Sequence, residues 1–229
     1  MKKFVFVFDL DSTVISIESL NHLIKSKITD VSTQRKIDKI ANAALNNEID
    51  YHECMFQRFY TAQLHEEDFA KEGELSVEHI NPGMRELFAW LKNNKYAIYI
   101  VSGGFLPVVK AVGKALDVQV THLYANTFTE KEDGTLELDD GVLTYSDGKI
   151  KVINDIRKTY KEDVIITMIG DGTSDLCTWT KNSKKPVANY FVGCGINVQR
   201  PNVKKNCEMY ALNTKEMQKY FIEIIKSES

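Results

Sequence analysis

The sequence predicts an α/β protein built on a doubly wound parallel sheet. Apolar runs of strand length alternate along the chain with segments of helical spacing. The runs occupy residues 4–8, 96–101, 118–124, 164–169 and 190–192. Strands that alternate with helices typically form a parallel sheet with helices on both faces. Such sheets bind ligands at the carboxyl ends of their strands, so polar residues at those ends are the first candidates for a site.

Acidic residues directly follow two of the apolar runs. The first run leads into Asp9 and Asp11, and the run 164–169 leads into Asp171 and Asp175. Turn and helix-capping chemistry would account for one such ending, whereas two of them favour a common site. An ionised carboxylate beside an apolar core costs free energy unless a cation, hydrogen bonds or a chemical task offsets that cost.

A bound cation is expected if the two strands are neighbours, because the four carboxylates then share one small volume. Two carboxylates about 5 Å apart repel by about 3 kcal/mol at an effective dielectric constant of roughly 20. Oxygen ligands without sulfur or imidazole favour a hard ion. The sequence therefore predicts Mg²⁺, with Mn²⁺ or Ca²⁺ as the competing ions.

A phosphate site is expected after the run 96–101, which ends in Ser102-Gly103-Gly104 ahead of a predicted helix. Glycines let backbone N–H groups approach a ligand, and the start of a helix adds a positive dipole end. Most such tripeptides are plain turns, so this motif does not establish the site alone. Lys149, at the start of another predicted helix, could add a positive charge to the same phosphate. Lys151, two residues later, could do so as well, and only the order of the elements along the chain favours Lys149.

A helical insert separates the first strand from the rest of the predicted sheet. Apolar spacing predicts four helices in it: Ser19–Lys27, Ser32–Asn46, Tyr51–Leu64 and Glu66–Glu72. We expect residues 17–79 to form a small helical domain, with 1–16 and 80–229 forming the core. The expected hinges are 14–18 and 78–83, since Pro82 and Gly83 interrupt the helical pattern.

A peripheral β-excursion is expected at 126–145, where Asp133-Gly134 and Asp140-Gly141 are typical of hairpin turns. We assign it no chemistry.

Composition narrows the class of protein. The chain has 229 residues, of which 43% are hydrophobic and 27% charged, as expected for one or two globular domains. A net charge of -3 gives no overall attraction to nucleic acid or to an anionic membrane, and no apolar run approaches the roughly 18 to 20 residues that span a bilayer. Four cysteines without a CxxC pair favour reduced thiols and a cytoplasmic location. A monomer and a homodimer both stay open.

The motifs, in their order along the chain, resemble those of the haloacid dehalogenase superfamily of phosphohydrolases. Asp9-Leu-Asp11-Ser12-Thr13-Val14 matches the first motif, Ser102 the second, Lys149 the third, and Gly170-Asp171-Gly172-Thr173-Ser174-Asp175 the fourth. The resemblance implies a Rossmann-like core with a cap. The insert and several flanking segments are similar to the phosphoserine phosphatase branch of this superfamily, particularly its eukaryotic form. These segments are 101–105, 148–153, 168–172 and 197–203.

The resemblance implies a role for each motif residue. Asp9 would be the nucleophile that forms an aspartyl phosphate, and Asp11 would protonate the leaving hydroxyl and then deprotonate the attacking water. Mg²⁺ would be held by the Asp9 side chain, the Asp11 backbone carbonyl and Asp171. The phosphate would be bound by Ser102, Gly103 and Lys149, and Asp175 would complete the catalytic group.

The same resemblance implies the substrate. The ammonium of O-phosphoserine would meet Glu18, and its carboxylate would meet Arg58, with Arg200 as a further arginine. Ser174 stands where relatives often have Asn or Thr, so we expect altered metal hydration rather than lost chemistry. The expected reaction is hydrolysis of O-phosphoserine to serine and phosphate, as in serine biosynthesis.

Other functions are weighed against this one. A relative of the same fold could act on another small phosphate ester or pass the phosphoryl group to an acceptor. A signalling receiver module also gathers acids, a hydroxyl residue and a lysine around Mg²⁺. The cap-sized insert and the Ser12-Thr13 pair that follows the acids argue against that module. A descendant that only binds is conceivable, but every expected catalytic position is filled.

Overall fold

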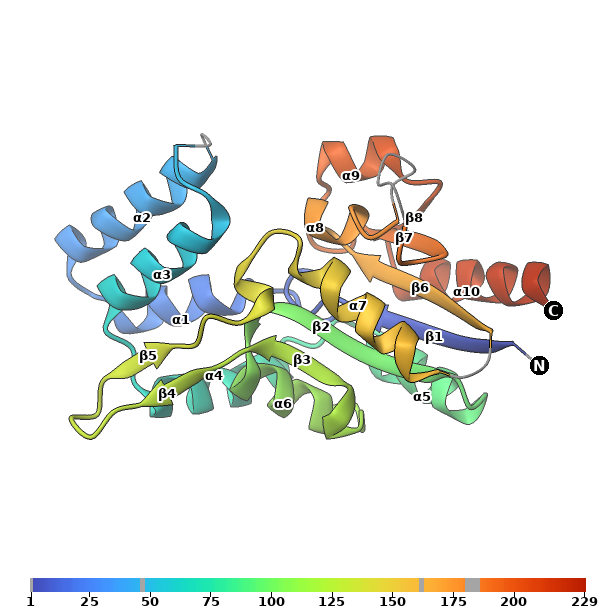
Figure 1. The fold of residues 1–229 in the computed structure, drawn as a ribbon, viewed down its shortest axis with the longest axis horizontal. Coiled ribbons are helices and arrows are strands. Elements are labelled where there is room, and N and C mark those ends of the chain that lie inside the picture. The colour runs from blue at the N-terminus through green and yellow to red at the C-terminus, as the bar shows by residue number, and fades with distance from the viewer. Residues whose placement is uncertain (1, 46–47, 161–162, 180–185) are drawn as a thin grey trace.

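One parallel sheet forms the centre of the molecule (Figure 1). The computed structural model describes residues 2–45, 48–160, 163–179 and 186–229. Six strands lie in the order β3-β2-β1-β6-β7-β8 and pair in parallel. Their bounds are β1 Lys3–Phe8, β2 Ala97–Phe105, β3 Leu123–Asn126, β6 Val164–Gly170, β7 Tyr190–Cys194 and β8 Met209–Ala211. The predicted doubly wound parallel sheet is confirmed.

Helices cover both faces of this sheet. The first face packs against α5 Met84–Asn93, α6 Leu106–Ala115 and α10 Thr214–Glu228. The second packs against α7 Gly148–Thr159, α8 Thr173–Leu176 and α9 Pro201–Asn206. Successive side chains of a strand point to opposite faces, and β1 is apolar on both because it lies in the middle of the sheet.

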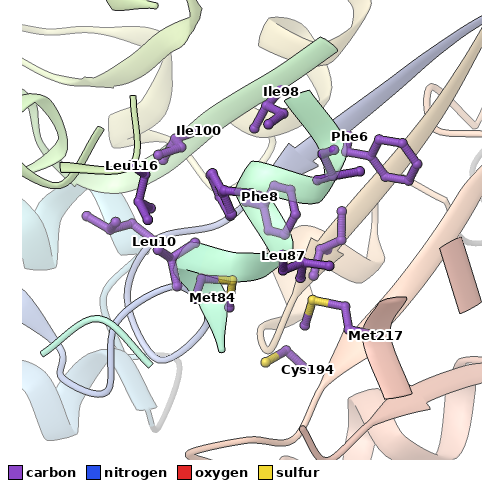
Figure 2. Packing of buried hydrophobic residues seen from close by; sticks show 14 of the residues in the cluster. Phe6, Phe8, Leu10, Met84, Leu87, Ile98, Ile100, Leu116, Cys194 and Met217 are labelled. Carbon is purple, nitrogen blue, oxygen red and sulfur yellow. The ribbon is translucent and has the colours of Figure 1, made fainter. Parts of the chain in front are cut away.

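Aromatic packing anchors β1 on the first face (Figure 2). The ring centroid of Phe6 lies 4.5 Å from that of Phe221, and Phe8 lies 4.6 Å from Phe88. All four side chains are fully buried. Each contributes about 2 to 3 kcal/mol of hydrophobic stabilisation, so the strand that ends at Asp9 is held firmly in place.

Four helices form the insert after β1: α1 Ser19–Lys27, α2 Val31–Leu45, α3 Tyr51–Ala62 and α4 Glu66–Glu78. The predicted α2 ended at Asn46, which lies outside the described residues. The last helix is six residues longer than predicted, because Gly73 and Ser76 pack toward the core; a Cβ on Gly73 would meet Ala111 of α6 at 3.0 Å. The division into a cap and a core stays a prediction.

The two expected hinge segments lie side by side. Ile15 pairs with Ile80 in an isolated antiparallel bridge, Ser16 N–H donates to His79 O over 2.9 Å, and Asn81 N–H donates to Val14 O over 3.0 Å. The chain therefore leaves and re-enters the core at one place.

Three details of the sheet differ from the prediction. The run 118–124 was expected as a strand, but Val120–His122 forms a 3-10 turn (η1) on the surface, where Val120 is 64% exposed, and β3 begins at Leu123. Strand β8 is three residues long, too short for a periodic pattern. Strand β2 continues through Ser102-Gly103-Gly104 with a shift of register rather than ending in a turn.

The excursion after β3 is partly as predicted. Strands β4 Phe128–Glu130 and β5 Leu136–Leu138 form a hairpin around the turn that contains Gly134. The second predicted hairpin turn, at 139–141, is wrong: it leads into a 3-10 turn (η2), Val142–Thr144, which packs against α7.

Within the described part of the chain, no helix combines the length and apolar character that crossing a bilayer requires.

Candidate active site

The two acidic strand ends meet at the carboxyl edge of the sheet. Strands β1 and β6 are neighbours, and the Asp9 N–H donates to Ile169 O over 2.9 Å. A cavity of about 390 Å³ opens above them. Every residue proposed from the sequence for the site lines this cavity: Asp9, Asp11, Glu18, Arg58, Ser102, Gly103, Lys149, Asp171, Ser174, Asp175 and Arg200.

A strained turn after β1 brings Asp9 and Asp11 to the same cavity. Ser12 has a φ of 54°, in the left-handed region that costs a side-chain-bearing residue about 1 to 2 kcal/mol. The Leu10 carbonyl accepts hydrogen bonds from the next turn of backbone, and Asn197 Nδ2 donates to Ser12 O over 3.0 Å. These hydrogen bonds stabilise the turn and offset the strain at Ser12, so Asp9 and Asp11 can both face the cavity.

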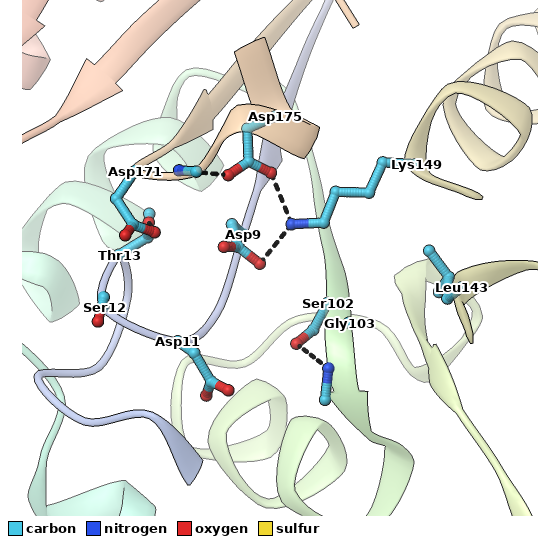
Figure 3. A network of polar contacts seen from close by, with 12 residues as sticks. Asp9, Asp11, Ser12, Thr13, Ser102, Gly103, Leu143, Lys149, Asp171 and Asp175 are labelled. Atoms are coloured by element: carbon cyan, nitrogen blue, oxygen red, sulfur yellow. Dashed lines mark hydrogen bonds and ion pairs between the residues drawn. The ribbon is translucent and has the colours of Figure 1, made fainter. Parts of the chain in front are cut away.

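Lys149 joins the acids of both strands (Figure 3). Its Nζ lies 2.7 Å from Asp9 Oδ1 and 2.6 Å from Asp175 Oδ1. Burial lowers the pKa of Lys149, but the carboxylates of Asp175 and Asp9 outweigh burial and raise that pKa above its usual range. The side chain is therefore a fixed positive charge. Lys151 lies outside the cavity lining and pairs with Asp147 at 3.1 Å.

Asp175 is folded over the end of β6. Its Oδ2 accepts a hydrogen bond from Gly172 N–H over 2.9 Å, and its Oδ1 accepts one from Lys149 Nζ. Burial and then the charge of Asp9 raise the pKa of the Asp175 carboxyl, which Lys149 opposes. A Cβ on Gly170 would stand 2.2 Å from Asp175 Cγ, so only glycine fits where the strand ends.

Replacing Gly170 by alanine is expected to displace Asp175 and with it Lys149. The added methyl group overlaps a packed side chain, which costs typically about 1 to 3 kcal/mol of unfolding free energy. Urea denaturation should show that loss together with a fall in activity. Gly141→Ala is the matched control, because a Cβ there would meet nothing within 4 Å; an equal loss of stability in both variants would contradict the steric account.

The carboxylates fit a hard divalent ion. Asp9, Asp171 and Asp175 are buried and each offers an oxygen within 4.8 Å of the others. Burial and the charge of Asp9 raise the pKa of Asp171, while Arg200 lowers it. A cation would relieve this mutual repulsion. The third side chain of this cluster belongs to Asp175. The resemblance instead implied the backbone carbonyl of Asp11 as the third metal ligand.

Asp11 has the environment of a proton donor. Ser19 Oγ donates to its Oδ2 over 3.0 Å, while its Oδ1 is buried and has no partner in the described part of the chain. Burial first, then the charges of Asp9 and Glu18, raise the pKa of Asp11 well above its usual range. A carboxylic acid with a free buried oxygen can hold a proton for a neighbouring leaving group.

The segment that the sequence suggested for phosphate binding, Ser102-Gly103-Gly104, lies on β2, beside β1. Ser102 is 1% exposed, and its Oγ accepts from Gly104 N–H over 2.9 Å. Tyr51 of α3 covers this segment: its hydroxyl donates to Gly103 O over 3.4 Å, and a Cβ on Gly103 would stand 2.7 Å from that hydroxyl. The insert therefore reaches the motif directly.

Glu18 and Arg58 of the insert and Arg200, which precedes α9, line the same cavity as the acids. Glu18 accepts from Ser12 Oγ over 2.8 Å and from Arg200 Nη2 over 3.2 Å. Arg200 Nε also donates to Asp171 Oδ2 over 2.7 Å. Arg58 donates to Asn21 Oδ1, while its buried Nε has no partner among the described residues.

Sequence reasoning missed the contribution of the excursion. Leu143 and Tyr145 near its end, and Ser146 directly after it, line the cavity. Tyr145 stacks on His52 of α3 with centroids 4.4 Å apart, and both donate to Asp140, over 2.9 and 3.1 Å. This segment therefore joins insert and core beside the site. Nothing in its local sequence indicated that contact.

Comparison with known proteins agrees with this geometry. The family model for haloacid dehalogenase-like hydrolases matches residues 6–179, so the chain belongs to that family. Within it, the chain is similar to phosphoserine phosphatase of Homo sapiens (29% identical over 212 residues, 92% of this chain and 89% of the relative) and of Bos taurus (28%, with the same coverage). The crystal structure of a phosphoserine phosphohydrolase-like protein from Francisella tularensis shares the fold, with a TM-score of 0.81, 22% identity, and coverage of 96% of this chain and 99% of that one.

Proposed function

We propose that this protein hydrolyses O-phosphoserine to serine and phosphate through an aspartyl phosphate on Asp9. The observation that carries the proposal is the buried contact of Lys149 with Asp9 and Asp175 beside Asp171, at the floor of a cavity whose walls carry Glu18 and Arg58. The similarity to phosphoserine phosphatases along nearly the whole chain supports it.

Charge compensation allows an anionic nucleophile to approach an anionic ester. Lys149 holds a positive charge 2.7 Å from Asp9, and Ser102 and the Gly103 N–H would bind the phosphoryl oxygens. Mg²⁺, held by the Asp9 side chain, the Asp11 backbone carbonyl and Asp171, would neutralise further charge on the phosphoryl group. Asp175 would act by holding Lys149 in place.

Asp11 would move the proton. Burial and the nearby charges raise its pKa and so favour its protonated form. It would donate a proton to the serine oxygen as the ester bond breaks, and then accept one from the water that attacks the aspartyl phosphate. The unpartnered Oδ1 is the atom available for both transfers.

Recognition of the serine moiety would come from the cavity wall. Glu18 would bind the ammonium group, and the guanidinium of Arg58 would bind the carboxylate through two parallel hydrogen bonds. Arg200 would contribute to the same carboxylate on leaving Asp171, and Ser174 would contact water near the metal. Residues 17–79 would act as a cap whose closure excludes water during phosphoryl transfer.

We also propose a cytoplasmic role in serine biosynthesis. All four cysteines are free, which supports a reducing compartment. The alternative is a phosphatase or phosphotransferase of the same family that acts on another small phosphate ester.

Arg58→Ala separates these functions. We expect kcat/KM for O-phosphoserine to fall on the order of 10- to 100-fold, because a charge-assisted contact to the carboxylate is lost. Hydrolysis of an aryl phosphate, which lacks that carboxylate, should not change. Steady-state rates on a panel of esters measure both.

Arg35→Ala is the matched control, since Arg35 lies on α2 of the same insert and does not line the cavity. Equal losses on phosphoserine and the aryl phosphate in Arg58→Ala would count against the substrate. Transfer of phosphate to an acceptor in place of water would favour the phosphotransferase.

A further inference from the structure

The orientation of the peptide group between Gly103 and Gly104 affects how Ser102 is placed in the proposed phosphate site. The N–H of this peptide donates to Ser102 Oγ over 2.9 Å, within a segment of β2 where the register shifts. Glycine reaches both signs of φ at little cost, so a peptide flanked by two glycines can rotate easily. Something outside the motif must hold it.

Asn126 makes the shorter of two hydrogen bonds to the other end of this peptide, the second being the 3.4 Å contact of the Tyr51 hydroxyl with Gly103 O. Asn126 is the last residue of β3, is 2% exposed, and donates from Nδ2 to Gly103 O over 2.8 Å. The same Nδ2 lies 3.5 Å from Leu143 O. Two carbonyl oxygens around one amide atom identify that atom as the NH₂ group.

The other atom of the Asn126 amide, Oδ1, carries an energetic penalty. Asn126 Oδ1 is buried and has no partner in the described part of the chain. An unsatisfied buried acceptor costs about 1 to 3 kcal/mol. An apolar side chain of similar size would avoid that cost but could not donate to Gly103 O or Leu143 O. The donor contacts therefore explain why an asparagine stands here.

The C=O and N–H groups of a trans peptide point in opposite directions. Fixing Gly103 O at Asn126 therefore aims the Gly104 N–H at Ser102 Oγ. With that lone pair occupied, the Ser102 hydroxyl proton points elsewhere, and it donates to no group in the described residues. Ser102 lines the cavity, so its hydroxyl can donate to an anion bound there.

We propose that Asn126 is a positioning residue for the phosphate site: it locks the Gly103–Gly104 peptide so that the Ser102 hydroxyl donates to a bound phosphoryl group. The inference rests on the proposed function only in that the site binds phosphate. The serine moiety of the substrate plays no part in it.

Binding of inorganic phosphate in the presence of Mg²⁺, measured by calorimetry, tests the proposal without any assumption about the ester. Asn126→Asp replaces the donor by an oxygen that repels Gly103 O, and we expect its phosphate affinity to fall about tenfold. Asn94→Asp makes the same chemical change at a surface amide that donates to Trp90 O, and should leave affinity unchanged.

A double-mutant cycle separates positioning from general damage. If Asn126 acts through the Ser102 hydroxyl, Asn126→Asp should weaken binding in the parent protein and have little further effect in a Ser102→Ala background. Equal losses in both backgrounds would overturn the proposal, as would a parent protein that binds no phosphate.

Asn126→Leu guards against a folding defect. It removes the orphaned Oδ1 but also takes the donor from Gly103 O and Leu143 O, so the two effects on stability oppose each other. Urea denaturation should therefore show a cooperatively folded protein that loses no more than about 1 to 3 kcal/mol of unfolding free energy, while phosphate affinity falls as in Asn126→Asp. Unfolding of both variants, or phosphate affinity at the parent level in Asn126→Leu, would contradict the assignment. Loss of phosphoserine turnover with intact phosphate binding would instead count against the proposed substrate alone.

Discussion

Replacing Asp9 by asparagine is expected to abolish turnover. The amide keeps the size and shape of the side chain and one acceptor oxygen, but it cannot attack phosphorus to form an acyl phosphate. Loss of a covalent nucleophile commonly costs on the order of 10⁴-fold or more in kcat. Phosphate release from O-phosphoserine under saturating Mg²⁺ measures the effect.

The fold should survive this change. Asp9 follows a strand whose last four residues are buried, and it repels its neighbouring acids, so its neutralisation relieves repulsion even as its ion pair with Lys149 is lost. Asp155→Asn, at an exposed ion pair with Lys158, is the matched control and should retain full activity. More than a few per cent of parental activity in Asp9→Asn, once deamidation is excluded by mass spectrometry, would refute the nucleophile assignment.

Removing divalent metal is expected to have an effect of similar size. Without a cation, the carboxylates of Asp9, Asp171 and Asp175 repel one another and the incoming phosphate. A chelator should therefore stop phosphate release, and excess Mg²⁺ should restore it. Mn²⁺ and Ca²⁺, tested at equal concentration, would show which hard ion the site prefers.

Metal binding should also be visible without catalysis. A ligand that binds only the folded state stabilises it by about 2.7 kcal/mol at a concentration 100 times its Kd, so Mg²⁺ should raise the Tm of the parent protein. Asp171→Asn removes one ligand charge and should lose most of that rise. Full activity in chelator, or an equal Tm rise in both proteins, would contradict the metal site.

Hydrophobic patterning predicted the fold wherever segments were long and buried. The central strands β1 and β6 and the four insert helices, apart from the last six residues of α4, follow from their apolar spacing, because burial of those side chains decides the local structure. The pattern failed at the periphery. Within the run 118–124, Val120–His122 forms a surface turn and only the end of the run enters β3, and β8 owes its pairing to β7 rather than to its own three residues.

The site was predictable where its residues directly follow strands. Asp9 and Asp171 had to meet once β1 and β6 were neighbours, and the family resemblance supplied Lys149 and Arg58. Asn126 and Tyr145 could not be found in this way. Their contacts depend on how the edge strand and the excursion pack against β2 and α3, and side-chain direction across such contacts leaves no periodic signal in the sequence.

The covalent step is tested most directly by stopping the enzyme with acid during turnover of O-phosphoserine and mapping the phosphoryl group by mass spectrometry. The account predicts one phosphoryl group, carried on the Asp9 side chain, that forms and decays at rates compatible with turnover. Sustained phosphate release with no phosphoryl group on Asp9, or with the group on another residue, would contradict it.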